Sequence, residues 1–330
     1  MIKNRHLLLT SFLLLIFGSL GYGQQEYQIS HNMFNSVAIN PGSVGGNEAI
    51  DVTAIMRQQW VGFKDSKGNN VAPQTFLVSI DAPLNFLHGG IGATVMQDKL
   101  GFDKTINLKL DYAYRTTFAA GDLGLGLQVN IANMSRDFGK FVTPDGSESG
   151  SGSGSGSGAS NDPVLNQQAG QTDMIFDFGL GAFYKVPGSY YAGISASNIL
   201  QTKGTNTSNN VKRHYYLTGG YEYTLPGHPA YEIDPSVFIK TDGTVVQYDF
   251  NALVKYNNKF WGGLSFRPQD AVVILLGVNI KSLMVGYSYD LTTSKILGAG
   301  TAGSHEIMLR YSFNLEFEKH PRSYKNTRFL

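Results

Sequence analysis

The stretch from Lys104 to Thr116 reads KTINLKLDYAYRT and alternates between two kinds of side chain. One set is apolar or aromatic and consists of Ile106, Leu108, Leu110, Tyr112 and Tyr114. The set between them is Asn107, Lys109, Asp111, Ala113 and Arg115. Because successive side chains of a β-strand point to opposite faces, this pattern predicts a strand with one apolar and one charged face. A soluble sandwich would bury the apolar face, whereas a barrel in lipid would turn it outward and line a wet lumen with charges.

Similar segments follow one another from Ile50 to Leu315, and we count about fourteen of them. In the segment after Lys104–Thr116, Gly124 and Gly126 fall on the polar, inward side. Only 15% of residues are charged, while the chain holds 18 Tyr and 20 Phe, which suits strands with aromatic residues at a lipid–water interface. The sequence therefore predicts an all-β fold, an up-and-down antiparallel transmembrane β-barrel of about 14 strands in the outer membrane.

The connections between these segments support the same fold, because barrels of this kind alternate short periplasmic turns with long outer loops. Every second connection is short. The four longest connections all fall in the other set: Val61 to Pro73, Met134 to Thr172, Gln201 to Val211 and Leu291 to Ser304. With the N-terminus on the periplasmic side, the long loops face outward.

Both ends of the chain have a composition unlike the strands. Residues 1–23 combine a basic start, an apolar run and a Gly21-Tyr22-Gly23 cleavage pattern, which indicates a signal peptide. We expect residues 24–49 to form an N-terminal periplasmic segment, residues 50–315 the barrel, and residues 316–330 a C-terminal periplasmic tail. Within the long outer loop at residues 134–172, the Ser-Gly run from Ser149 to Gly158 predicts a flexible spacer, natural or engineered.

No motif indicates catalysis, a cofactor or a bound metal. The chain has no cysteine, its seven histidines lack metal-ligand spacing, and the Gly146–Gly150 match to Gly-x-Ser-x-Gly lies in low-complexity sequence. A net charge of +1 with scattered basic residues argues against nucleic acid as a partner. The charges expected to face the lumen, and to cross-link its filled or water-filled interior, are Lys109, Asp111, Arg115, Asp177, Asp249, Lys255, Arg267, Asp290 and Arg310.

A family resemblance begins directly after the leader. The run SHNMFNSVAINPG from Ser30 to Gly42, followed by Gly45 and Gly46, is similar to the opening of PorP/SprF family proteins. Ser36 and Gly42 stand where proline and alanine are expected. The resemblance continues in RQQWVGF from Arg57 to Phe63, and then in these stretches: Pro73–Thr75, Ser79–Pro83, Gly90–Gly92 with Asp98 and Gly101, and the tail Arg322–Leu330.

The resemblance implies a non-enzymatic outer-membrane component of the type IX secretion system of Bacteroidetes, exported by its signal peptide. It would assist secretion, surface attachment or gliding by a partner adhesin that carries a type B C-terminal sorting domain. Its partners would be type IX components, that secreted surface protein and outer-membrane lipid. Candidate partner-contact residues are Met33, Phe34, Asn35, Asn40, Pro41, Arg57, Trp60, Phe63, Arg328, Phe329 and Leu330. For Arg57 to Phe63 an interfacial anchor is an equal alternative, with Trp60 and Phe63 in an aromatic girdle.

Two other functions stay open. An outer-membrane transporter or channel for a small, hydrophobic solute would have a hydrophobic lumen patch and a plugging N-terminal segment. A barrel enzyme would need a catalytic set of Ser, His and an acid, and the sequence offers no such set.

Overall fold

The computed structural model describes residues 26–47, 49–65, 68, 70–136, 171–205, 211–294 and 301–314. The leader at residues 1–23, the Ser-Gly run and the tail at residues 316–330 lie outside the described residues. The strands are β1 (Ala49–Gln58), β2 (Gln74–Leu84), β3 (Gly89–Leu100), β4 (Asp103–Phe118), β5 (Gly121–Arg136), β6 (Gln171–Val186), β7 (Tyr190–Ser197), β8 (His214–Tyr221), β9 (Tyr223–Thr224), β10 (Tyr231–Thr241), β11 (Val246–Tyr256), β12 (Phe260–Arg267), β13 (Ala271–Ile280), β14 (Leu283–Thr292) and β15 (Ser304–Asn314).

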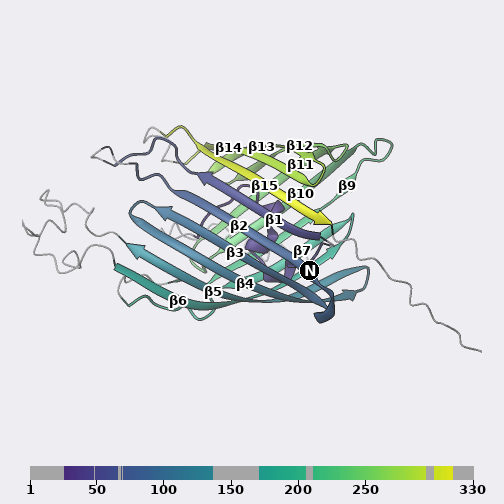
Figure 1. Ribbon diagram of the computed structural model, residues 1–330. Coiled ribbons are helices and arrows are strands. Elements are labelled where there is room, and N and C mark those ends of the chain that lie inside the picture. The colour runs from purple at the N-terminus through teal and green to yellow at the C-terminus, as the bar shows by residue number, and fades with distance from the viewer. Residues whose placement is uncertain are drawn as a thin grey trace, which may run out of the picture.

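These strands form one closed antiparallel barrel (Figure 1). Neighbours in the chain pair with one another, and the first strand pairs with the last over Ala49↔Asn314 to Gln58↔His305. β8 and β9 both pair with β10 and are separated by Glu222 alone, so they act as one interrupted strand. The barrel therefore has 14 strands, which confirms the predicted fold. Among the described residues, no helix has the length and apolar character needed to cross a membrane.

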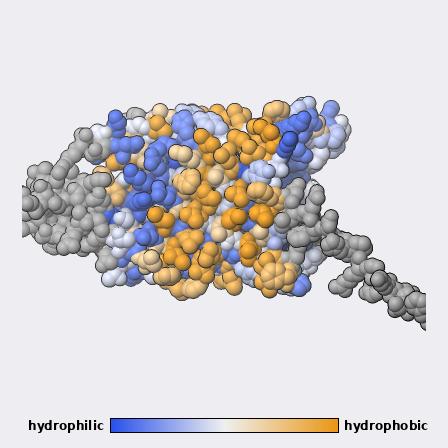
Figure 2. Space-filling model, in the orientation of Figure 1, coloured by the Kyte–Doolittle hydropathy of each residue, from blue (hydrophilic) through white to orange (hydrophobic). Residues whose placement is uncertain are grey.

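The two faces of the barrel wall follow the predicted alternation. On β4, Leu110 and Tyr114 are 46% and 48% exposed, whereas Lys109 and Asp111 are 3% and 5% exposed and face the lumen. Figure 2 shows, on one face of the barrel, the outward apolar side chains gathered in a band across the middle of the wall. Apolar side chains thus face the membrane and polar ones are buried, which is the reverse of a soluble domain.

The four longest connections lie at one end of the barrel, as predicted. One end of the barrel carries short turns, such as residues 119–120 between β4 and β5 and residues 187–189 between β6 and β7. The other end, on the left in Figure 1, carries the connections at residues 59–73, 137–170, 198–213 and 293–303. We call these ends the short-turn end and the long-loop end.

The main departure from prediction is the segment before β1. We expected residues 24–49 to form a separate periplasmic segment, but residues 26–46 lie inside the barrel, where Ser30, His31 and Ala38 are completely buried. This segment, the plug, folds into three short 3-10 turns: η1 (Asn32–Phe34), η2 (Ser36–Ala38) and η3 (Pro41–Ser43). A fourth turn, η4 (Asn85–Leu87), connects β2 to β3. The physical reason for the departure is that the inward-facing charges need partners, and the polar plug supplies them.

Candidate functional site

The plug and the lumen wall that holds it form the candidate site. The plug begins near the long-loop end of the lumen, where the Lys240 ammonium on β10 donates to the backbone oxygen of Glu26 at 2.8 Å. It then crosses to the short-turn end and joins β1 at Ala49. The lumen wall holds it in two different ways on its two sides.

On the side of β1, β11, β12, β14 and β15, the wall holds the plug with charges. Glu306 of β15 is completely buried and accepts the backbone N–H groups of Ser30 and His31, each at 2.8 Å. The Nδ1 atom of His31 lies 2.7 Å from the same carboxylate. Three contacts from two successive residues therefore fix this part of the plug to one acidic side chain.

The hydroxyl of Ser30 lies at the centre of this charged side. It accepts hydrogen bonds from Arg57 at 2.7 Å and Arg267 at 2.9 Å, and donates to Asp290 at 3.0 Å. The two guanidinium groups also reach Asp290 directly, at 2.6 Å from Arg57 and 2.9 Å from Arg267. One small plug hydroxyl thus completes a network that links three strands of the wall.

Asp249 of β11 closes the network on its far side. Arg267 donates to it at 3.1 Å, and the plug amides of Gln28 and Asn32 donate at 2.8 Å and 3.1 Å. Buried ions are tolerated only when they are paired and hydrogen-bonded, since each costs several kcal/mol to remove from water. We call Ser30, His31, Arg57, Asp249, Arg267, Asp290 and Glu306 the ionic cluster.

An apolar patch adjoins the ionic cluster. The Phe34 ring packs against Trp261 of β12 with ring centroids 4.6 Å apart, and His31 meets the same indole edge-on at 5.8 Å. The patch continues over inward-facing wall residues that are buried under the plug: Ile55, Leu77, Met96, Leu253, Val273, Leu275 and Met308. The lumen therefore contains the hydrophobic patch and the plugging segment that a transporter was expected to have.

On the side of β3, β5, β6 and β7, the wall holds the plug with glycine backbone. A Cβ added at Gly126 would lie 2.2 Å from the carbonyl carbon of Pro41, and one at Gly181 would lie 2.1 Å from the side-chain oxygen of Asn40. Only glycine lets the η3 turn approach the strands this closely. We call this surface, formed by Gly90, Gly92, Gly124, Gly126, Gly181 and Gly193, the glycine groove.

Asn40 anchors the η3 turn in the glycine groove. Its amide nitrogen donates to the carbonyl oxygens of Ala182 at 3.0 Å and Ile194 at 3.2 Å, on two neighbouring strands. Its side-chain oxygen accepts the backbone N–H of Gly42 at 2.8 Å and so caps the turn that Pro41 begins. Asn40 therefore caps the η3 turn and ties it to two strands of the wall.

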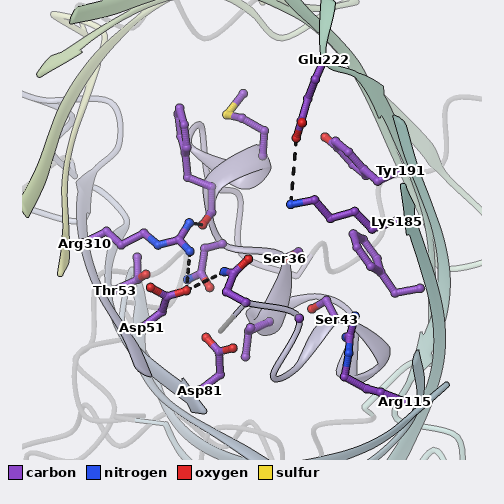
Figure 3. Close-up of a pocket in the computed structure, with 17 residues that line it drawn as sticks. Ser36, Ser43, Asp51, Thr53, Asp81, Arg115, Lys185, Tyr191, Glu222 and Arg310 are labelled. Atoms are coloured by element: carbon purple, nitrogen blue, oxygen red, sulfur yellow. Dashed lines mark hydrogen bonds and ion pairs between the residues drawn. The ribbon is translucent and has the colours of Figure 1, made fainter. Parts of the chain in front are cut away.

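A cavity of about 150 Å³ opens at the short-turn end between the plug and the wall (Figure 3). The plug forms its floor with Met33, Phe34, Asn35 and Ser36. Its walls carry charges of both signs, which are Asp51, Asp81 and Glu222 against Arg115, Lys185 and Arg310. The Lys185 ammonium nitrogen lies 4.0 Å from a carboxylate oxygen of Glu222. The cavity therefore suits water or a small polar molecule that carries both a positive and a negative group.

The candidate partner-contact residues fall into three groups. Met33, Phe34, Asn35, Asn40, Pro41 and Arg57 come together in the lumen, and Asn35, Asn40 and Arg57 are at most 3% exposed. Trp60 and Phe63 lie beyond β1 at the long-loop end and form an edge-on ring pair at 6.2 Å. Arg328, Phe329 and Leu330 lie outside the described residues. The buried group therefore contacts the barrel's own wall.

Sequence reasoning placed Asp249, Arg267 and Asp290 in the lumen but missed Ser30, His31 and Glu306 as their partners. Glu306 could have been found, because it alternates with the outward residues Ile307 and Leu309. Among the described residues, no group of three or more His, Asp or Glu side chains is placed to hold a metal ion.

One ion pair lies outside the membrane-spanning strands, at the long-loop end. Lys212 lies 3.0 Å from Asp242 in the turn between β10 and β11. Burial alone would raise the pKa of Asp242, but the backbone N–H groups of Val245 and Thr244 and the Lys212 ammonium hold this pKa at about 2. The turn is thus organised around an ionised carboxylate.

Several solved outer-membrane proteins share the general shape of this chain. The toluene transporter TbuX of Ralstonia pickettii is 12% identical, with a TM-score of 0.48 over 84% of this chain and 92% of that one. Omp33 of Acinetobacter baumannii is 9% identical, with a TM-score of 0.43 over 81% of this chain and 99% of that one. Comparison with curated proteins gave no match.

The family assignment comes from the sequence. The model of the type IX secretion system membrane proteins PorP/SprF matches residues 22–311, which include the plug, its wall and all fourteen strands except the last residues of β15. The SHNMFNSVAINPG run, Ser30 to Gly42, forms the central part of the plug. The chain therefore belongs to the PorP/SprF family of type IX secretion system membrane proteins.

Proposed function

We propose that this outer-membrane barrel acts as a closed, non-enzymatic scaffold that assists secretion or surface attachment of a partner adhesin with a type B C-terminal sorting domain. The observation that carries the proposal is the occupied lumen. Residues 26–46 fill it and are held by buried ion pairs on one side and by backbone contact on the other. A wall that retains a plug leaves no open path through the lumen. It suits a protein that binds its partners at the long-loop end and the short-turn end of the barrel.

The two rims offer different contact surfaces. At the long-loop end, Trp60 and Phe63 are partly exposed beside the long connections, where they can meet a secreted partner. At the short-turn end, β15 ends at Asn314, so the tail with Arg328, Phe329 and Leu330 starts on the side we assign to the periplasm. Cationic and aromatic residues in that tail suit docking onto an acidic periplasmic component.

Truncation after Phe317 tests the scaffold function in the native host. The truncated barrel should still fractionate with the outer membrane and run as a heat-modifiable band, because the closed wall ends at Asn314. Surface display of the adhesin, measured by labelling intact cells with antibody, should be lost. Deletion of Ser149 to Gly158 is the control and should leave display unchanged, since this run of Ser and Gly offers no charged or apolar side chain for docking. Normal display by the assembled truncated barrel would contradict the role of the tail.

A transporter of a small hydrophobic solute is the second candidate, and the plug with its apolar patch favours it. The expected substrate path would open only when the plug moves away from Trp261 and Leu275. Liposomes containing the purified barrel should take up no solute if the scaffold proposal holds. Uptake by the wild-type barrel, and its loss when an engineered disulfide fixes Asn35→Cys to Ser79→Cys, would favour the transporter instead. These two positions are joined by a 3.0 Å hydrogen bond, and the chain has no other cysteine.

A further inference from the structure

A row of polar side chains crosses the outward face of the barrel at the long-loop end. Strand registers place its members side by side in the order His305, Gln58, Gln74, Lys99, Lys104 and Ser135, from β15 to β5. None of these six is acidic. Four residues closer to the middle of each strand, the outward side chains in register are all apolar. They are Leu309, Ala54, Val78, Val95, Leu108 and Ile131. The polar row therefore lies at the edge of the membrane band.

Two lysines stand opposite each other in this row. Lys99 of β3 and Lys104 of β4 are register partners, and both are exposed. Like charges directly opposite on neighbouring strands destabilise a sheet. Within the part of the chain that the structure describes, neither ammonium forms an ion pair. The acids of this hairpin are used elsewhere, since Asp98 accepts from Thr75 at 2.6 Å and Asp103 pairs with Arg136 at 2.7 Å.

The depth of the two lysines matches the headgroup layer. A strand tilted by about 40° advances about 2.6 Å along the membrane normal for each residue. The outward residues from Ile106 to Tyr114 then span about 21 Å, close to the apolar band of about 25 Å seen in such barrels. Lys104 lies two residues further out, about 5 Å beyond Ile106 and so at the edge of the band. Figure 2 shows hydrophilic side chains gathered between the apolar band and the long-loop end.

We propose that Lys99 and Lys104 bind a phosphate group on the headgroup of an outer-leaflet glycolipid of the lipopolysaccharide class. A phosphate between the two ammonium groups removes their mutual repulsion and gains two charge-assisted hydrogen bonds. Gln97, Gln74 and Ser135 lie beside the pair and supply further polar groups to the sugar. Toward the short-turn end the outward residues of β4 include Tyr112 and Tyr114 and no lysine, so within β4 the basic residue lies at the long-loop end alone. This assignment rests on the outward direction of the long loops and is independent of the adhesin role.

Native mass spectrometry of the purified full-length barrel in detergent tests the site, with diphosphorylated lipid A as the probe. Wild type should bind one lipid A, and the double variant Lys99→Gln/Lys104→Gln should bind it about tenfold more weakly or worse. The matched control is Lys259→Gln/Lys281→Gln, which removes two exposed lysines from turns at the short-turn end and should bind as wild type does. A heat-modifiable band for each variant confirms that it is folded.

Two further probes separate the sources of the phosphate. Lipid A from which both phosphates have been removed should bind as weakly to wild type as intact lipid A binds to the double variant. Inorganic phosphate should not displace the lipid at equal concentration. Equal binding of the dephosphorylated lipid, or unchanged binding by the double variant, would overturn the proposal. Displacement by inorganic phosphate would reveal a general anion site and would overturn the glycolipid assignment.

Discussion

The ionic cluster and the glycine groove hold the same plug by opposite means. The ionic cluster uses side chains from five strands, and its contacts depend on charges that meet across 2.6–3.3 Å. The glycine groove uses no side chain from its glycines and depends on backbone surfaces that fit closely. One side is specific through chemical pairing and the other through shape. The difference predicts that the two sides fail differently when a single residue is changed.

The largest effect is expected in the ionic cluster. Arg267→Met leaves Asp249 and Asp290 buried with fewer cations, and breaking a buried ion pair in this way costs about 3–5 kcal/mol. Urea unfolding of the purified barrel, followed by the fluorescence of Trp261 and Trp60, measures the loss. The double variant Arg267→Met/Asp249→Asn should recover part of it. If the double variant recovers nothing, charge pairing is not what stabilises this side.

A charge on the outer face should cost almost as much without involving the plug. Leu108→Arg places a guanidinium against lipid near the middle of β4 and should lower stability by about 2–4 kcal/mol. Asn107→Arg, one residue away and facing the lumen, should be tolerated. The same urea experiment compares the two variants. Equal losses would show that the faces of β4 are wrongly assigned by one residue.

The glycine groove should respond with a smaller loss of stability but with release of the plug. Gly126→Val adds atoms where even a Cβ would lie 2.2 Å from Pro41, and overpacking of this kind costs about 1–3 kcal/mol. Maleimide labelling of Ser36→Cys in the same chain should become faster, because the plug is displaced. Gly219→Ala is the control, since its Cβ meets only the Tyr191 oxygen at 3.6 Å. Unchanged labelling of a folded Gly126→Val barrel would show that close fit is not required.

The smallest effect is expected at the rim, in the β10–β11 turn. The pKa of Asp242 is held at about 2, below its ordinary value of 3.8, so its contribution is complete above pH 3.8 and is lost as the pH falls through 2. Asp242→Asn should therefore cost less than about 1 kcal/mol near pH 6, because the Lys212 partner is 42% exposed, and only a small part of that near pH 2, where the carboxyl is half protonated. Thermal unfolding at the two pH values measures the difference. If Asp242→Asn lowers stability equally at pH 6 and at pH 2, the loss comes from the hydrogen bonds of the turn and not from the charge of Asp242.

The barrel wall could be predicted from the sequence because the polar or apolar character of each strand residue indicates whether it faces the lumen or the membrane. Strict alternation in β4 identified Leu108 as outward and Lys109 as inward. Lys109 is 3% exposed, whereas Val95, the register partner of Leu108, is 48% exposed, which confirms the two faces. The 14 strands and the placement of the four longest connections follow from the same local signal. The break between β8 and β9 at Glu222 went undetected, since the sequence was counted as fourteen uninterrupted segments.

The plug could not be predicted in the same way because its contacts are far apart in sequence. Ser30 and Glu306 are 276 residues apart, and nothing local in SHNMF specifies a partner on the last strand. Three 3-10 turns also leave no periodicity to detect. Two indirect signals were present. Inward charges of both signs implied unseen partners, and the inward Gly124 and Gly126 implied that some other backbone comes close.

The pairing of β1 with β15 also constrains the order of folding. The plug precedes β1 directly, and its partners lie on β6 and β7 as well as on β15, so it cannot reach its place by local steps. Contacts of such long sequence separation form slowly, because the entropy of closing large loops is lost before they contribute. Until the plug enters, Glu306, Asp290 and Asp249 face an incomplete set of donors. The seam between β1 and β15 should therefore be among the last parts of the sheet to form, with the plug entering as the seam closes. An assembly factor that holds these two edge strands apart would give the plug time to enter.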